Sequence, residues 1–209
     1  MVFGLIDLYG NFYFSSENII QSAILYDPDN EEVQLSDLIN YNRKRVFGIY
    51  DADDSQWIYY EEPFYESSYG AQFETALVPG EYNLIATDKN GNSYENSFNF
   101  DEQVNIPIIS ASTFQYYFDN SGNFICEWDI PKNIPNDLKT SAKVFIDAYT
   151  NDTCVALLSV KIPSHLGYIF VPSEIIQLLR TEGNVLKFYL QLGTNDNNNR
   201  SYSNSIVID

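Results

Sequence analysis

Residues Glu81–Phe100 constrain the fold of this chain more strongly than any other stretch, because they predict a β-hairpin of defined register. Apolar and polar side chains alternate from Tyr82 to Ala86, and they alternate again after a polar turn, from Tyr94 onwards. A period of two residues is typical of strands with one buried face. The stretch therefore predicts two antiparallel strands joined by a short loop.

The length of that loop decides the register of the hairpin. A two-residue Asn90-Gly91 loop would set apolar residues opposite polar ones. A three-residue loop, Lys89–Gly91, aligns the apolar positions and gives Gly91 the left-handed conformation of a type I turn followed by a bulge. The predicted pairs are then Tyr82 with Phe98, Leu84 with Asn96 and Ala86 with Tyr94. Such a hairpin has one apolar face, which a second sheet must cover.

Similar alternation along both halves of the chain predicts an all-β protein of two tandem antiparallel β-sandwich domains of the Ig-like type. The 209 residues exceed the roughly 100 residues of a single sandwich. We place the domains at residues 1–103 and 107–209, with the short connection Val104–Ser112 between them. The other expected strands are two within Val2–Phe14, then Asn18–Asp27, Val33–Leu38, Val46–Tyr50, Gln56–Glu61, Ala71–Leu77, Phe114–Phe118, Phe124–Ile130, Ala142–Thr150, Cys154–Ile162, Tyr168–Val171, Val185–Leu192 and Tyr202–Ile208.

Three segments have other expected roles. Pro172–Arg180 predicts one short helix in the second domain, because proline opens it, Arg180 lies late and Gly183 follows. Arg43–Arg45 is interpreted as a solvated start of the next strand. Phe64–Gly70 is interpreted as an irregular aromatic loop.

Charge limits the classes of partner. The chain has 29 acidic and 11 basic residues, for a formal net charge of −18, which repels nucleic acid phosphates and anionic lipid headgroups. We expect neutral, cationic or metal-ion partners and no nucleic acid. No apolar run reaches the roughly 18 residues that cross a bilayer, so we expect no membrane insertion. The first residues lack the features of a signal peptide, and we expect a secreted, periplasmic or cell-surface protein whose leader is not present in this chain.

Two cysteines, Cys126 and Cys154, fall in the same half of the chain. This pattern fits one disulfide or two buried thiols. We favour thiols.

Two resemblances to known families follow from these residues. Trp128 just before Pro131, followed by a late strand reading LKFYLQLG, resembles fibronectin type III and related immunoglobulin-like domains, although the predicted helix departs from that family's usual short connection. The likeness spans roughly residues 107–209. The run LVPGEYNLIATDKNG, within Phe73–Phe100, resembles carboxypeptidase-regulatory-like and other Ig-like modules of secreted bacterial proteins. The resemblances imply a non-catalytic module and bring no active site.

The sharpest metal candidate is the segment DADDSQWIYYEE, which has oxygen-bearing side chains at four ligand positions of a calcium-loop pattern. Gln56 stands where that pattern has glycine, and the flanking residues alternate as strands. An acidic hairpin turn is therefore the competing interpretation. Calcium is the one cofactor we consider, and its candidate ligands are Asp51, Asp53, Ser55 and Glu62.

Aromatic residues concentrate close to the same segment. Flat rings edged with carboxylates and amides suit the C–H faces of sugars. Because a strand at residues 57–60 has two faces, one aromatic pair must point away from its own core unless the Phe64–Gly70 loop or the neighbouring domain covers it. The candidate ligand-binding residues are Trp57, Tyr59, Tyr65 and Tyr69.

These patterns favour a non-enzymatic extracellular or cell-surface module with a structural, adhesive or assembly role. Its partners would be proteins or further copies, joined through sheet edges, and the apolar terminal stretch Met1–Phe14 is one such candidate. The alternative is a carbohydrate-binding or accessory module that uses aromatics near Trp57 to hold polysaccharide. A hydrolase has little support, because the single histidine, His165, lies in a predicted turn without a nucleophile motif.

Overall fold

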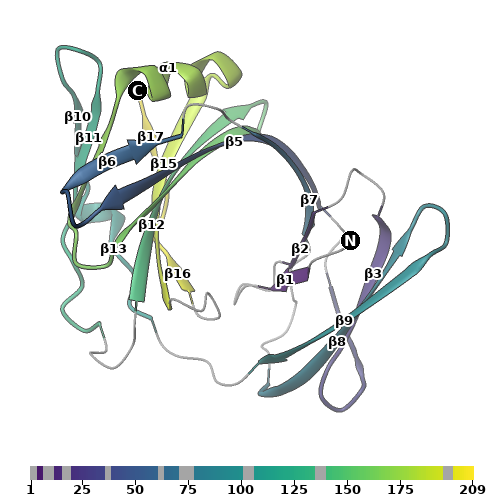
Figure 1. The fold of residues 1–209 in the computed structure, drawn as a ribbon. Helices are drawn as coiled ribbons and strands as arrows, with labels where there is room; N and C mark the ends of the chain where they lie inside the picture. Colours follow the sequence, from purple (N-terminus) through teal and green to yellow (C-terminus); the bar gives the residue numbers. More distant parts are fainter. Residues whose placement is uncertain are drawn as a thin grey trace. The chain divides into compact units, whose positions relative to one another are not determined.

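The structure is a computed structural model, and it describes residues 4–6, 12–15, 20–35, 39–60, 64–70, 78–100, 106–134, 140–194 and 200–209. For residues 4–6, 12–15, 39–42 and 64–70 the description covers the backbone alone. The described residues form an all-β fold with several antiparallel sheets and one α-helix (Figure 1). The predicted all-β class with one short helix is confirmed.

The bounds of the elements are as follows. The strands before residue 101 are β1 (Gly4–Ile6), β2 (Phe12–Ser15), β3 (Ile20–Tyr26), β4 (Glu32–Val33), β5 (Ile39–Asp51), β6 (Gln56–Tyr59), β7 (Phe64–Gly70), β8 (Gly80–Asp88) and β9 (Ser93–Phe100). The later elements are η1 (Ala111–Thr113), β10 (Gln115–Phe118), β11 (Phe124–Glu127), β12 (Thr140–Thr150), β13 (Thr153–Pro163), β14 (Tyr168–Val171), α1 (Ser173–Glu182), β15 (Val185–Thr194), β16 (Arg200–Tyr202) and β17 (Ile206–Ile208).

Contacts divide the chain into two compact units. The first contains Met1–Asn42 and Glu66–Asn105, and the second contains Arg43–Tyr65 and Ile106–Asp209. Residues 43–65, which we had placed within the domain at 1–103, therefore group with the second unit. The reason is that β5 pairs in parallel with β13, a connection between strands about 110 residues apart that local alternation does not encode.

The predicted hairpin is present in the first unit as β8 and β9. Its register pairs Tyr82 with Phe98, and the same register matches the two other predicted pairs, Leu84 with Asn96 and Ala86 with Tyr94. The Gly91 backbone has φ of +85°, and its N–H donates to the Asp88 carbonyl at 3.0 Å. The loop geometry and the register are thus confirmed.

The first unit buries the face that the hairpin pattern indicates. One sheet of this unit has four strands in the order β4–β3–β8–β9. In addition, β2 pairs antiparallel with β1 and with β7. Tyr82 is buried, and its hydroxyl donates to the Val78 carbonyl at 2.9 Å and accepts from the Val78 N–H at 3.0 Å. The core of this unit consists of Ile20, Leu25, Tyr82, Leu84, Ala86 and Phe100.

The second unit has two sheets. In the larger sheet the order is β6–β5–β13–β12–β15, and both β16 and β17 pair with β15. The smaller sheet has the order β10–β11–β14. Rings join the two sheets: Phe124 of β11 and Phe188 of β15 have centroids 5.5 Å apart, and Trp128 lies 6.4 Å from Phe188. These aromatic contacts fix the core between the sheets.

Helix α1 begins after Pro172, as the sequence predicts, and ends before Gly183. Ile175, Ile176 and Leu179 are its buried residues, and the helix contacts β12, β13 and β15. A Cβ on Gly183 would lie 2.8 Å from the backbone nitrogen of Tyr149. Glycine at this position therefore allows the chain to pass close to β12.

Several local predictions differ from the structure. Residues 64–70, expected as a loop, form strand β7, and Arg43–Arg45 lie inside β5 rather than at a solvated strand start. The single last strand expected at Tyr202–Ile208 is two strands, β16 and β17. Alternation could not show these points, because strand pairing depends on distant partners. The strand predicted at Ala71–Leu77 lies outside the described residues.

Candidate functional site

The central strands of the second unit are buried on both faces. Even-numbered residues of β12 and β15, such as Ile146 and Phe188, face the core beneath the smaller sheet. Residues that are paired across strands share a face. The register therefore places the odd-numbered residues of β5, β12, β13 and β15 on the opposite side, together with Arg200 and Tyr202 of β16. We call this side the polar face; it carries Arg43, Arg45, Phe47, Lys143, Phe145, Asp147, Tyr149, Ser159, Lys161, Lys187, Tyr189, Gln191, Arg200 and Tyr202.

Asp147 is a buried carboxylate at one end of the polar face. Its side chain is 5% exposed, and it accepts hydrogen bonds from the hydroxyls of Tyr189 at 3.2 Å and Tyr149 at 3.4 Å. Burial raises the pKa of Asp147 to about 6, since desolvation outweighs the opposing charge of Arg43 and the tyrosine hydrogen bonds. This group therefore changes its charge under mildly acidic conditions.

Cations lie along the whole polar face, and the other end is centred on Lys143. Lys143 lies directly opposite Lys161 across the β12–β13 pair. Burial, and then the charges of Arg200, Arg45 and Lys161, lower the pKa of Lys143 to about 8. Three cationic side chains thus act on Lys143, and one of them, Arg45, lies in register with Asp147 through Leu157.

Aromatic rings lie along the polar face beside its cations. Phe145 and Tyr189 stack with centroids 4.9 Å apart and an interplanar angle of 12°. The Arg45 guanidinium lies 5.0 Å from the centroid of the Phe47 ring, and the Lys187 ammonium lies 4.3 Å from that of Tyr149. The polar face thus combines cations, rings and one titratable carboxylate on a rigid sheet.

Trp57 and Tyr59, two of the predicted ligand-binding residues, lie on β6 and point towards the smaller sheet. The Trp57 ring is 5.7 Å from that of Tyr168, and the Tyr59 hydroxyl donates to the Phe170 carbonyl. Burial raises the pKa of Tyr59. Both side chains are half-buried, whereas their neighbours Ile58 and Tyr60 are exposed.

Tyr65 and Tyr69, the other two, lie on strand β7, where Tyr69 pairs with Phe14 of β2. Their side chains are outside the described part of the chain. The structure therefore brings Trp57 and Tyr59 together and gives no arrangement for all four residues.

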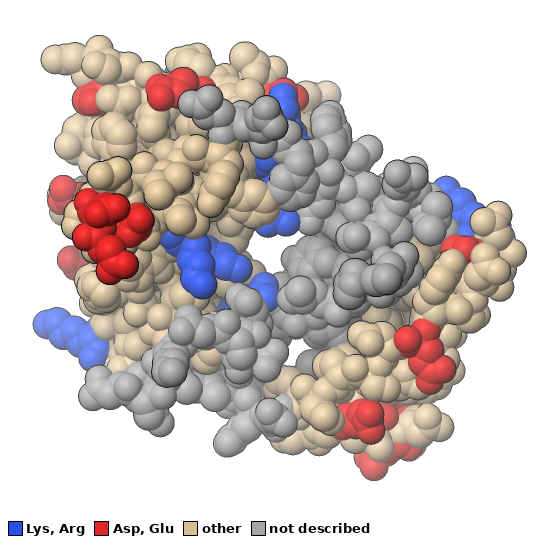
Figure 2. Space-filling model, viewed as in Figure 1, with Lys and Arg blue, Asp and Glu red and all other residues tan. Residues whose placement is uncertain are grey.

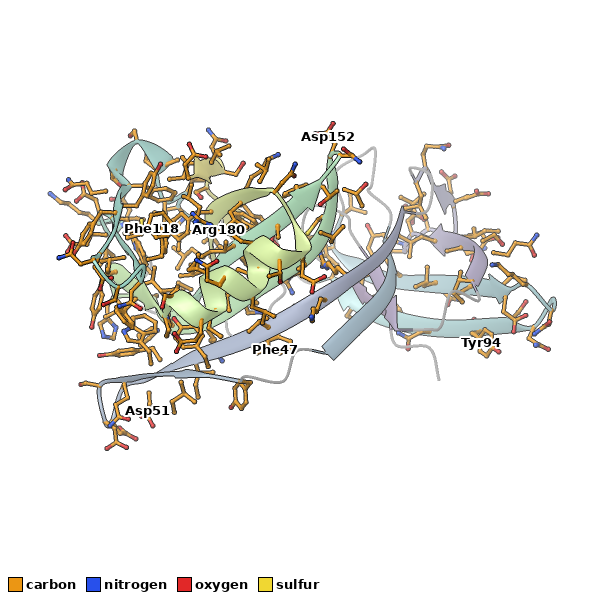
Figure 3. All side chains as sticks on the ribbon, turned by 90° about the horizontal axis from the view of Figure 1, so that it is seen from above. Phe47, Asp51, Tyr94, Phe118, Asp152 and Arg180 are labelled. Carbon is orange, nitrogen blue, oxygen red and sulfur yellow. The ribbon has the colours of Figure 1, made fainter. Side chains whose placement is uncertain are left out.

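The calcium candidates Asp51, Asp53 and Ser55 lie at the turn between β5 and β6, and Figure 3 shows Asp51 at the tip of this hairpin. Asp51 Oδ1 accepts the backbone N–H of Asp53 at 3.0 Å, and Ser55 has a positive φ of 52°. These features are those of a hairpin turn. Glu62 lies outside the described residues.

Other aspartate-rich turns use the same chemistry. Asp88 and Asp119 each open a turn in which the carboxylate accepts two backbone N–H groups and the side-chain amide of an asparagine four residues later. These hydrogen bonds lower the pKa of both aspartates. At Asp27, Oδ1 likewise accepts the N–H groups of Asp29 and Glu31. Their oxygens thus stabilise the turns.

Of the remaining chemically distinctive residues, His165 and Cys126 lie outside the polar face, whereas Cys154 lies close to Asp147 and Arg43. His165 is exposed in a turn between β13 and β14. Cys126 and Cys154 are both free, in agreement with the preference for thiols, and burial raises the pKa of Cys126 to about 12 and of Cys154 to about 11. Within the described ranges, no group of three or more His, Cys, Asp or Glu side chains could hold a metal ion.

Sequence reasoning missed the polar face. A signal was present: Lys143 and Asp147 lie in an otherwise apolar strand, both at odd positions, and Arg43 and Arg45 have the same spacing. The pattern could not show that these residues share a face, because among the described strands β13 lies between β5 and β12 and joins them.

No family model matches the chain, and a search of the curated proteins finds no match either. The described residues form several β-sheets, which is compatible with a β-sandwich fold, and no match assigns the chain to the fibronectin type III or immunoglobulin-like families. No helix within the described residues is long and apolar enough to cross a membrane.

Proposed function

We propose that this chain is a non-enzymatic module of a secreted or cell-surface protein, related to immunoglobulin-like and fibronectin type III-like sandwiches, with a structural, adhesive or assembly role. The observation that carries the proposal is the edge strand β10. Tyr117 of β10 is 55% exposed and Tyr116 is 39% exposed. Among the described strands, β10 pairs with β11 alone. An edge strand with exposed rings is suited to strand addition by a partner.

A charge placed on this edge is expected to prevent assembly. The wild-type chain should show a mass that rises with concentration in light scattering, and Tyr117→Lys should remain monomeric, since a charge on an edge strand opposes pairing. Ile108→Lys is the matched control, because Ile108 is 63% exposed outside the strands. A wild-type chain that is monomeric at every concentration would contradict assembly through β10.

A second candidate function is polysaccharide binding, favoured by the ring cluster at the margin of the second unit. The rings of Tyr50 and Trp57 lie 4.8 Å apart, and Tyr168 packs edge-on against Trp57 with 38% of its own surface exposed. Adjacent rings with an exposed member suit stacking against sugars.

Trp57→Ala and Tyr168→Ala are expected to abolish retention on the polysaccharides that the wild-type chain binds, by loss of the stacking surface. A glycan array followed by affinity electrophoresis would measure this. Tyr117→Ala is the control, since it removes an exposed ring at another edge. Absence of wild-type binding to every glycan would rule out the second candidate, and circular dichroism would verify that each variant is folded.

A further inference from the structure

Two edge strands of the second unit, one from each of its sheets, lie together at one margin. Among the described strands, β10 pairs with β11 alone and β17 pairs with β15 alone. The hydroxyl of Tyr116 in β10 donates to the carbonyl of Val207 in β17 at 3.3 Å, so the two strands are neighbours. Tyr117 is 55% exposed, Val207 49% and Tyr116 39%. We call these two strands the β10–β17 margin; it presents apolar surface from both sheets at once.

The β10–β17 margin lacks the residues that usually keep an edge strand from pairing. Natural edge strands are protected by charged side chains, especially lysine, or by proline. Residues 115–118 read QYYF and residues 206–208 read IVI. Neither strand contains a charge or a proline, although the chain has 29 acidic and 11 basic residues. Both strands are therefore suited to burial against a partner.

The second edge of the smaller sheet, β14, contacts β6 of the larger sheet. The Tyr59 hydroxyl donates to the Phe170 carbonyl of β14, and the Trp57 ring packs edge-on against Tyr168 at 5.7 Å. Gly48 allows this contact, because a Cβ at that position would lie 2.9 Å from the Tyr59 ring. Since β14 already has these partners within the unit, β10 is the better edge for extending the smaller sheet.

The margin at β6 also differs in charge. The turn between β5 and β6 carries Asp51, Asp53 and Asp54, and Figure 2 shows acidic side chains gathered at this side of the second unit. Tyr60, directly after β6, is 53% exposed, so this margin has apolar surface as well. Charges beside an edge strand oppose pairing, and they would repel the same turn of a second copy. The β10–β17 margin is therefore the better surface for self-association.

We propose that two copies of this chain associate through the β10–β17 margin and form a closed dimer, which rests on the proposed assembly role and identifies its partner. Identical surfaces in contact are related by a two-fold axis, and the assembly closes at two copies because each has used its margin. Strand β10 of one copy then lies antiparallel to β10 of the other and extends the smaller sheet across the interface. The exposed side chains of Tyr116, Tyr117 and Val207 are buried in the same contact.

Salt separates this self-association from the binding of a cationic partner. Two copies that each have a net charge of −18 repel one another, and salt screens the repulsion. We therefore expect the dimer to form more tightly in about 0.5 M than in about 0.05 M sodium chloride. A contact between opposite charges would weaken under the same change.

Sedimentation equilibrium of the full chain would measure the stoichiometry and the dissociation constant together. We expect monomer and dimer without larger species. Val207→Glu should weaken the dimer by at least about tenfold, because the contact would bury a carboxylate; glutamate is chosen since residue 207 pairs with Lys187. Tyr60→Glu is the matched control, since it introduces the same charge at a similarly exposed side chain beside β6, and it should leave the dissociation constant unchanged.

Several results would overturn the closed dimer while leaving assembly through an edge strand in place. They are species larger than a dimer, an affinity that falls with salt, weakening by Tyr60→Glu equal to that by Val207→Glu, and weakening by Tyr117→Lys without any effect of Val207→Glu. Circular dichroism would verify that each variant is folded. A wild-type chain that is monomeric at every concentration and salt would contradict both the dimer and assembly through β10.

Discussion

Replacing Phe188 with alanine is expected to lower the free energy of unfolding of the second unit by about 3–5 kcal/mol. Phe188 has no exposed surface, and its ring contacts those of Phe114 at 5.1 Å and Phe124 at 5.5 Å. The substitution removes the ring through which β15 of the larger sheet contacts β11 of the smaller sheet, and it leaves a cavity between the two sheets. Because most domains are stable by only about 5–15 kcal/mol, this loss would be a large part of the total.

Urea denaturation monitored by tryptophan fluorescence would measure the effect. Both tryptophans, Trp57 and Trp128, belong to the second unit, so the signal reports this unit alone. Val207→Ala is the control, since Val207 is 49% exposed and its truncation should change stability by less than about 0.5 kcal/mol. A loss below about 1 kcal/mol in Phe188→Ala would contradict a core centred on this ring.

The second large effect concerns Asp147 and depends on pH. Its pKa of about 6 in the folded chain lies above the ordinary value of 3.8, so the unfolded state releases the proton more readily. The ionised form therefore opposes folding: the cost is absent below about pH 4, grows between pH 4 and pH 6, and is complete above pH 6. The charged and titratable neighbours of Asp147 are Arg43, Arg45, Tyr149, Cys154, Lys187 and Tyr189.

Asp147→Asn is expected to raise the free energy of unfolding at pH 8 by up to about 3 kcal/mol, because each unit of pKa corresponds to about 1.4 kcal/mol. At pH 4 the variant and the wild type should be equally stable. Urea denaturation at several pH values would show this convergence. Asp152→Asn is the control, since Asp152 is exposed at the tip of the β12–β13 hairpin (Figure 3). A pH-independent difference between Asp147→Asn and the wild type would contradict the burial argument.

Local elements were predictable where the interacting residues are close in sequence. The β8–β9 register followed from the apolar positions and the glycine of the loop, because a hairpin of given loop length has only one register that aligns its apolar face. Helix α1 followed from Pro172, Arg180 and Gly183 for the same reason. In each case the deciding contacts lie within about twenty residues.

The candidate site was less predictable. Trp57 was a candidate sugar ligand whose exposure the sequence left open, and the structure places it, half-buried, against Tyr168 of another sheet. Arg45 was interpreted as a solvated residue, yet it lies within β5 on the polar face. Both outcomes depend on which distant strand lies alongside, and a period of two shows that a strand has two faces without showing what covers either one.

The amino-acid sequence by itself determined that this protein is built of β-strands, where its main hairpins turn and where its one described helix lies, because these features depend on neighbouring side chains. The tertiary structure decided that β5 joins the second unit through β13, and that Lys143 faces Lys161 in the same sheet that buries Asp147. The physical reason is that pairing between remote strands is selected by the packing of a whole core, and only that packing sets which charges meet and which lose their water.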